Sequence, residues 1–501
     1  MTTPSFALVG AVNSGKSSVT ATIAEDDRIG ISDEPGKTVE SQRFDCRGVG
    51  LTLWDTPGFQ NPREMLAEIQ AAASNSGAPL EVFRDFTSRH ASKRAFHAER
   101  ELLRPLFDGA AILYVIDTSK PLRRAHEAEM ELLRLTGLPR LAILNPTGPA
   151  QHEQAWRAKL GQQFGAVHQF NAHRAGISQR AGLFRTMATV ADQWSDSLRS
   201  AADKMEAEWS LRLQDAAQTI IELLGQSVPH VRSENIAPGD NKTDAIESSK
   251  KAFYDDLQQF ENDAHLKLRV LFRHHHVSID ADDALPRGDD LFRGETWRVF
   301  GLSWRTLVTL GLVSGAITGA GLGSLGEPFL PGVATATGAT IGGVGGATSA
   351  FFVGKSWAQP PVKEEHHEQT YWSKALSMKR RVKGMLSGTG TTITIGPLKS
   401  DNFPYILLDR AMVVVWHLAN RTHARQDKEQ LDPGAMKAAL DSIKASTEFW
   451  GNELKRSCVA FVKERNGRTP SDKCTEHFRT QLAKHLESMA AIPFPKVEKV
   501  P

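Results

Sequence analysis

Hydrophobic residues follow two different patterns along this chain, and the pattern changes near residue 186. Before that point, short apolar runs alternate with amphipathic segments, as in proteins that cover a parallel sheet with helices. We expect strands at 6–9, 50–54, 110–116, 138–144 and 166–170. Helices are expected from 18, over 122–136, and through most of 59–104. This last segment reads either as an insert that couples a bound ligand to the rest of the chain or as an exposed helical decoration.

Beyond residue 186 the periodicity is helical and rich in charge. It predicts helices over 186–224, 244–272, 435–456 and 471–489, with connectors at 226–241 and 278–294. From about residue 362 the tail, which begins Lys363-Glu364-Glu365-His366-His367, is expected to be charged helix, and 391–395 a short strand or ordered turn. The apolar helix 403–419, interrupted by Asp409 and Arg410, is interpreted as core rather than as a membrane contact.

Two uncharged stretches, 306–326 and 328–354, stand out in this second half. Glycine recurs at every fourth position in both, except that Ala350 fills one position of the second run, and on a helix this spacing makes a groove that lets two helices approach closely. The pattern predicts a glycine-zipper helical hairpin that inserts into membrane lipid, because each run could cover about 30 Å and each outer end carries a cation beside Trp304 or Trp357. A hairpin buried in soluble protein is the alternative.

These patterns divide the chain into four parts. We expect an α/β P-loop domain with a mostly parallel sheet at 1–185, followed by a mainly α-helical domain. The latter comprises a helical region at 186–300, the glycine-zipper hairpin at 301–358 and a C-terminal helical region at 359–501.

Residues 10–17 carry the most specific chemistry, because they form a complete GxxxxGK[ST] phosphate-binding loop between a strand and a helix. Lys16 is expected to reach the β- and γ-phosphates and Ser17 to bind Mg²⁺. Thr38 could supply a second hydroxyl to the metal, and Asp55, at the end of a strand, could hold it through water. The N–H of Gly58 could sense the γ-phosphate.

The motifs Asn13–Ser17 and Asp55-Thr56-Pro57-Gly58 resemble those of the Era/TrmE-like GTPases. The resemblance covers roughly residues 1–190 and implies GTP, GDP and Mg²⁺ as ligands. It places Phe59 where Ras-like proteins have a catalytic Gln, and Asn13 where some members bind K⁺. The second half resembles an uncharacterised domain attached to certain bacterial Era-like GTPases.

The fourth motif of these GTPases, Asn-Lys-x-Asp, is altered here to Asn145-Pro146-Thr147-Gly148. The lysine that stacks on the base and the carboxylate that grips guanine are both missing, so selectivity for GTP is expected to suffer. A loose fifth motif places the N–H of Ala172 near the base. The nucleotide-binding set is therefore expected to be Gly10, Asn13, Ser14, Gly15, Lys16, Ser17, Ser18, Asp55, Gly58, Asn145 and Ala172. The expected catalytic residues are Lys16, Thr38 and Gly58, and the expected metal ligands Ser17, Thr38 and Asp55 for Mg²⁺ and Asn13 for K⁺.

Composition narrows the remaining classes of function. A net charge of +2 and the lack of a basic stripe argue against nucleic acid as a partner. Three scattered cysteines exclude a disulfide framework, and the sequence starts without a signal-like segment, which favours the cytoplasm, at the inner face of the membrane. His274-His275-His276 with Asp280 and Asp282 could suggest a metal, but a solvated linker is the preferred interpretation.

Together these features predict a GTP-hydrolysing switch that controls a membrane-associated helical domain. Homo-oligomers or a membrane protein are the expected partners. A dynamin-like membrane remodeller and a nucleotide-binding pore or scaffold with little turnover are the alternatives, and an Era-like RNA factor is disfavoured.

Overall fold

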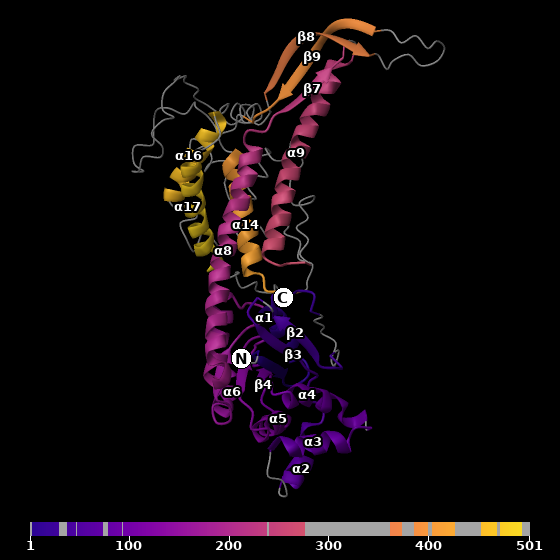
Figure 1. Cartoon of the computed structure of the whole chain (residues 1–501), viewed down its shortest axis with the longest axis vertical. Helices are drawn as coiled ribbons and strands as arrows, with labels where there is room; N and C mark the ends of the chain where they lie inside the picture. Colours follow the sequence, from indigo (N-terminus) through magenta and orange to yellow (C-terminus); the bar gives the residue numbers. More distant parts are fainter. Residues whose placement is uncertain are drawn as a thin grey trace, which may run out of the picture. The chain divides into compact units, whose positions relative to one another are not determined.

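The computed structural model describes residues 3–29, 38–46, 48–73, 79–92, 94–237, 240–275, 361–372, 385–398, 403–425, 452–467 and 471–492 (Figure 1). Its contacts divide the chain into two units. Unit 1 contains Met1–Leu213, Arg269–Val277 and Leu418–Lys428, and unit 2 contains Gln214–Leu268, Ser278–His417 and Glu429–Pro501. The predicted glycine-zipper hairpin at 301–358 lies outside the described residues.

A six-stranded sheet in the order β2-β3-β1-β4-β5-β6 forms the centre of unit 1. Its strands are β1 (Ser5–Val9), β2 (Gln42–Cys46), β3 (Leu51–Asp55), β4 (Ala111–Ile116), β5 (Arg140–Leu144) and β6 (Ala166–Gln169). All neighbours are parallel except β2, which pairs antiparallel with β3. The five predicted strands are confirmed, and with them the mostly parallel sheet of a P-loop fold. The edge strand β2 was not predicted.

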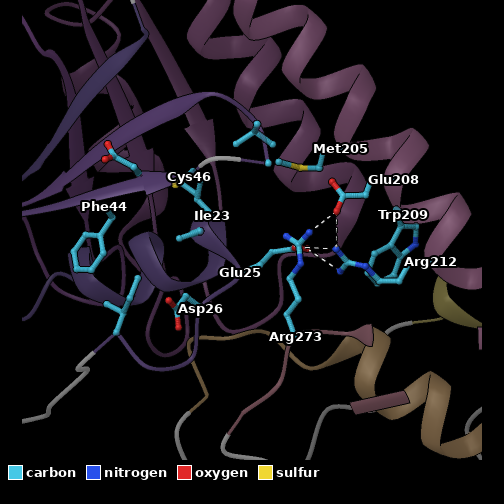
Figure 2. A pocket seen from close by; sticks show the side chains of 15 residues that line it. Ile23, Glu25, Asp26, Phe44, Cys46, Met205, Glu208, Trp209, Arg212 and Arg273 are labelled. Carbon is cyan, nitrogen blue, oxygen red and sulfur yellow. Dashed lines mark hydrogen bonds and ion pairs between the residues drawn. The ribbon is translucent and has the colours of Figure 1, made fainter. Parts of the chain in front are cut away.

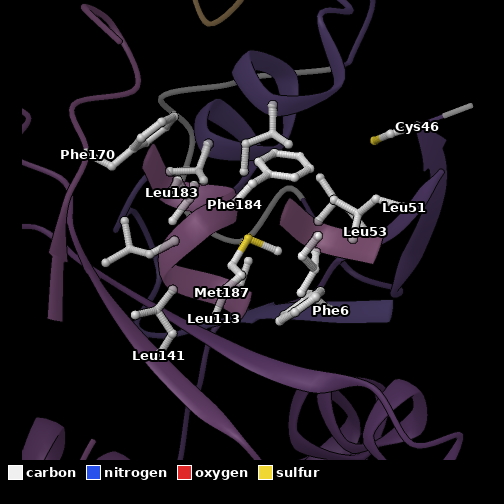
Figure 3. Close-up of a cluster of buried hydrophobic side chains, with 14 of the residues drawn as sticks. Phe6, Cys46, Leu51, Leu53, Leu113, Leu141, Phe170, Leu183, Phe184 and Met187 are labelled. Atoms are coloured by element: carbon white, nitrogen blue, oxygen red, sulfur yellow. The ribbon is translucent and has the colours of Figure 1, made fainter. Parts of the chain in front are cut away.

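Alternating residues of the central strands fill two separate cores, because successive side chains on a strand point to opposite faces. Phe6 and Leu8 pack into one cluster with residues of α7 (Ile177–Val190) such as Phe184 and Met187 (Figure 3). Ala7 lies in the other cluster with residues of the helices between positions 62 and 160. Burial on both faces explains why these strands read as continuous apolar runs.

Helices lie on both faces of this sheet. They are α1 (Lys16–Ala24), α2 (Pro62–Ala73), α3 (Pro79–Arg89), α4 (His97–Phe107), α5 (Arg124–Leu135), α6 (Glu153–Leu160), α7 (Ile177–Val190) and the start of α8 (Ser195–Ser227). Short 3-10 turns, Arg94–Phe96 and Asp192–Trp194, precede α4 and α8.

The helical segment between β3 and β4 is part of the core. Met65, Phe83, Phe86 and Leu102 from α2, α3 and α4 are each at most 2% exposed and belong to the second apolar cluster. The interpretation of this segment as an exposed decoration is therefore wrong, since its apolar faces are buried.

Unit 2 contains a three-stranded antiparallel sheet, β7-β9-β8. Its strands are β7 (Arg232–Ile236), β8 (Val362–Trp372) and β9 (Met385–Ile395). The expected connector at 226–241 thus contains a strand, and the tail from 362 begins as a strand rather than as charged helix. Pairing with β9 over the full length of β8 outweighs the helix propensity of its Lys and Glu residues.

The described helices of unit 2 are the later part of α8, α9 (Lys242–Leu271, which ends in unit 1), α14 (Phe403–Asn420), α16 (Asn452–Gly467) and α17 (Asp472–Ala490). In α14 the interpretation as core is confirmed by the burial of residues such as Val413 and Trp416. Arg410, 0% exposed, forms an ion pair with Glu261 of α9, with its Nε 2.7 Å from Glu261 Oε1. Among the described helices, none combines the length and apolar character needed to cross a membrane.

Candidate nucleotide-binding site

The loop between β1 and α1 has the backbone of a phosphate cradle. Gly10 and Gly15 have φ angles of 146° and 86°, and Asn13 is left-handed at 60°. A Cβ at Gly10 would lie 2.4 Å from the carbonyl oxygen of Val115, and one at Gly15 would lie 2.2 Å from the Asn145 amide. Glycine is therefore required at both positions by conformation and by space.

Lys16 begins α1, and its side chain turns back along this loop. Its Nζ donates to the carbonyl oxygens of Gly10 at 3.3 Å and Ala11 at 2.9 Å. Burial lowers the pKa of Lys16, while the nearby carboxylates of Asp55 and Glu129 oppose that shift. A buried ammonium held beside the loop is suited to neutralise phosphate oxygens.

Three predicted metal ligands come together at the first turn of α1. Ser17 Oγ donates to Asp55 Oδ2 at 2.6 Å, and the Thr38 side chain lies near enough to the same carboxylate to lower its pKa. Burial raises the pKa of Asp55, whereas Ser17, Lys16 and Thr38 counteract this shift. Two hydroxyls and a carboxylate are the oxygen donors that Mg²⁺ takes, so this set fits the metal that P-loop sites use.

The loop after β3 lies directly on the phosphate loop. A Cβ on Gly58 would lie 2.5 Å from the Val12 nitrogen, and the N–H of Phe59 donates to the carbonyl of Gly10 at 3.2 Å. Phe59 is 6% exposed and packs into the core beside α2. Its ring therefore cannot take the place of a side chain that orients water.

Helix α4 connects the two loops that carry Thr38 and Gly58. The buried Glu99 accepts hydrogen bonds from the N–H groups of Gln60 at 2.8 Å and Asn61 at 2.6 Å. Glu101 accepts from the N–H of Ser41, whose hydroxyl donates to the Glu101 carbonyl at 2.6 Å. A movement of either loop would therefore act on α4 through these hydrogen bonds.

Asn145, the surviving member of the fourth motif, is fully buried and joins two loops. Its Nδ2 donates to the Ser14 carbonyl at 3.1 Å, and its Oδ1 accepts from the N–H of Ala172 at 3.0 Å. The Ala172 N–H that was expected near the base is thus occupied by Asn145. Ser18 is buried in α1, while Asn13 is exposed.

Sequence reasoning missed a polar cluster built around Asp117, the residue after β4. Its carboxylate accepts from the N–H and hydroxyl of Ser119 and from the N–H and hydroxyl of Thr147, at 2.6–3.2 Å. Lys120 pairs with it at 3.1 Å. These donors lower the pKa of Asp117 against the opposing effect of burial. The signal in the sequence that could have revealed this cluster was an acidic residue directly after a buried strand.

A second cluster lies at the opposite end of α1, and three of its members, Glu25, Arg212 and Arg273, line a cavity of about 190 Å³ (Figure 2). Glu25 accepts from Arg180 at 2.5 Å, from Arg212 at 3.1 and 2.9 Å and from Arg273 at 2.8 Å. The side chain of Glu25 is 9% exposed. Although burial opposes it, the arginines hold the pKa of Glu25 well below its usual value.

His274 belongs to the same unit and is 2% exposed, so the expectation of a solvated linker is wrong at this position. Its ring stacks on that of His423 with centroids 4.4 Å apart, and its Nε2 contacts the carbonyl of Leu418 at 3.0 Å. Among the described residues, no group of three or more His, Cys, Asp and Glu side chains could hold a metal ion. Asp280 and Asp282 lie outside that part of the chain.

Two family models match the chain. The model described as "Domain of unknown function (DUF3482)" matches residues 157–486, and that of the "50S ribosome-binding GTPase" matches residues 5–145. A search of curated proteins finds no match.

Solved structures of GTPases also align with the chain. They include NFeoB of S. thermophilus, a single-site variant bound to GDP and AlF4⁻, at 20% identity over 54% of this chain and 88% of that one, with a TM-score of 0.23. Era bound to MgGDPNP and 16S ribosomal RNA aligns at 14% identity, over 54% and 88%, with a TM-score of 0.25. A variant of Aquifex aeolicus Era bound to GDP and AlF4⁻ aligns at 16%, over 54% and 90%, with a TM-score of 0.24.

Proposed function

Because this chain belongs to the family of the domain of unknown function DUF3482 and begins with a P-loop GTPase domain, we propose that it is a nucleotide-driven switch. In this proposal GTP and Mg²⁺ bind at the phosphate loop, and hydrolysis changes the conformation of the helical residues that the family model covers. Ser17, Thr38 and Asp55 would hold the metal, which supplies charge neutralisation for phosphoryl transfer. Lys16 would bind the phosphates beside it.

The observation that carries this proposal is the position of α1. The helix starts at Lys16 in the phosphate loop and ends beside Glu25, which binds Arg180, Arg212 and Arg273. All three arginines lie in the range matched by the DUF3482 model, 157–486. One rigid helix therefore links the phosphate end to side chains of the second family domain within unit 1.

Hydrolysis is tested first. The full chain should release phosphate from GTP in the presence of Mg²⁺, and Lys16→Ala should abolish both turnover and binding of labelled GTP. If Lys16→Ala turns over like the parent, the site described here is not the active one. Comparing KCl with NaCl in the same assay tests a K⁺ role for Asn13, since that role requires faster turnover in KCl.

Coupling is tested by hydrogen exchange of α8 in the presence of GDP or a slowly hydrolysed GTP analogue. We expect the middle turns of α8, around Arg212, to exchange differently in the two states. In Arg273→Met, which removes the half-exposed guanidinium of the cluster, that difference should shrink. Identical exchange in both nucleotide states of the parent protein would contradict the switch.

Base preference is a separate proposal, because the fourth motif lacks its carboxylate. We propose that GTP is preferred only weakly and that Gly148→Asp strengthens the preference over ATP. A Cβ at Gly148 would lie 3.5 Å from the Ser119 Cβ, which is an ordinary contact, so the aspartate can be accommodated. Competition of GTP, ATP and XTP against labelled GTP measures this, and equal competition before and after the substitution would refute it.

Membrane association through 306–354 rests on the sequence pattern alone, as do the cytoplasmic location and self-association. Flotation of the full chain with liposomes in each nucleotide state tests the first of these. Strong stimulation of hydrolysis with tubulation of liposomes would favour a dynamin-like remodeller. Binding without turnover would favour a pore or scaffold, and no flotation would remove the membrane from the proposal.

A further inference from the structure

Lys120, in the loop between β4 and α5, is held at both ends beside the phosphate loop. Its Nζ donates to the carbonyl oxygen of Asn13 at 3.1 Å and pairs with Asp117 at 3.1 Å. Its own carbonyl oxygen accepts from Nε1 of Trp156 at 2.9 Å, and that indole is buried. Hydrogen bonds and the ion pair therefore hold both the ammonium group and the backbone of Lys120.

Between these two anchors the lysine remains open to solvent, with 52% of its side chain exposed. An exposed lysine normally keeps much of its rotamer entropy, which a ligand must overcome when it orders the side chain. Here the ammonium already has two partners, so a ligand could pack on the methylene stem without ordering it. A preorganised contact of this kind favours binding.

The position of Lys120 is also where a nucleoside is expected. In a parallel sheet the ligand lies beyond the carboxyl ends of the strands, and the loops after β4, β5 and β6 carry Lys120, Asn145 and Ala172. Asn145 joins the last two loops to the phosphate loop. Asp117 joins Lys120 to Thr147 of the fourth motif. The lysine is thus connected to the residues that surround the base side of the site.

Resting on the nucleotide-binding function proposed above, we propose that Lys120 is the nucleoside-contacting lysine of this protein, supplied from the β4–α5 loop. Pro146, at the usual place of a lysine in the fourth motif, has no cation to offer. The stem of Lys120 packs against one face of the base, and its ammonium, fixed by Asn13 and Asp117, lies near the π-system or the ribose. Any purine has such a face, so this contact strengthens binding without choosing guanine.

The test uses the full chain and measures Kd for labelled GTP with Mg²⁺ in four variants. Lys120→Ala removes stem and charge, whereas Lys120→Met keeps most of the stem. Lys120→Ala combined with Pro146→Lys moves the lysine to the fourth motif. Lys159→Ala, a lysine of α6 paired with Glu127, is the matched control. Each variant is also challenged with inorganic tripolyphosphate, which has phosphates but no base.

We expect Lys120→Ala to weaken GTP about 10-fold and to leave the tripolyphosphate affinity unchanged. The GTP affinity of Lys120→Met should lie between those of Lys120→Ala and the parent. The double variant should recover affinity, and Lys159→Ala should match the parent. Asp117 keeps its Ser119 and Thr147 donors in all of them, so the cluster should persist.

Two results would overturn the assignment. If Lys120→Ala binds GTP as tightly as Lys159→Ala, the lysine does not contact the nucleoside. If Lys120→Ala weakens the binding of GTP and of tripolyphosphate equally, Lys120 acts only through the Asn13 carbonyl on the shape of the phosphate loop. Failure of the parent protein to bind GTP is a different result, because it would refute the proposed function itself and this inference with it.

Discussion

Replacing Glu25 by alanine tests the charge cluster at the end of α1 most directly. The substitution removes one carboxylate that accepts hydrogen bonds from three guanidinium groups, at 2.5–3.1 Å. Arg180 and Arg212, each with 6% of the side chain exposed, would remain buried without this partner.

The contacts around Glu25 set limits on the free energy of unfolding that the substitution removes. Removing one partner of a buried ion pair typically costs about 3–5 kcal/mol, because the remaining charge stays desolvated. Glu208 lies 3.6 Å from Arg212 and also pairs with Arg273, so it offsets part of the loss. We expect Glu25→Ala to lower the free energy of unfolding of unit 1 by about 3 kcal/mol.

Urea unfolding, followed by hydrogen exchange of peptides from α1 and β1, reports this free energy for unit 1 alone. Glu206→Ala is the control, since Glu206 pairs with Arg185 at the surface and should cost about 0–1 kcal/mol. The pH dependence adds a second check. Because the folded pKa of Glu25 is depressed, its contribution is complete above its ordinary pKa and is lost as pH falls through the folded value. Equal losses in Glu25→Ala and Glu206→Ala would refute the reasoning.

Two further predictions concern the phosphate end. Burial raises the pKa of Glu129, which accepts from the Tyr114 hydroxyl at 2.9 Å, to about 7. The folded protein therefore holds a proton that the unfolded chain releases at lower pH, so stability should fall as pH rises from about 4.5 to about 7. Glu129→Gln should abolish that decline and be more stable by about 3 kcal/mol at pH 8 in urea titrations; an unchanged pH profile would contradict this. Gly58→Ala should reduce hydrolysis at least 10-fold, since its Cβ would lie 2.5 Å from the Val12 nitrogen, and parent-like kcat would contradict that contact.

The parts of the fold that the sequence predicted are those determined by local residues. The phosphate loop needs Gly10, Gly15 and Lys16 in one short segment, and strands buried on both faces show as apolar runs. Strands β2 and β7 have mostly exposed or half-exposed polar side chains, so no apolar alternation marked them. They exist because β3 and β9 offer partners, which single-sequence patterns do not show.

The same distinction holds for the site. Ser17, Thr38 and Asp55 could be predicted from motif spacing, and the structure brings them together. Lys120 and the arginines around Glu25 could not, because their roles depend on partners as far as 248 residues away along the chain. The sequence around an arginine on a charged helix does not show whether its side chain will be a buried ion-pair partner or will be solvated.

The amide bridge of Asn145 has a consequence for how such a domain can diverge. One buried side chain holds the loops of Ser14 and Ala172 together, whatever occupies positions 146 and 148. Pro146 is only half-buried and Gly148 is exposed, so neither supports the bridge. Substitutions at positions 146 and 148 therefore leave the hydrogen bonds that hold these two loops together in place.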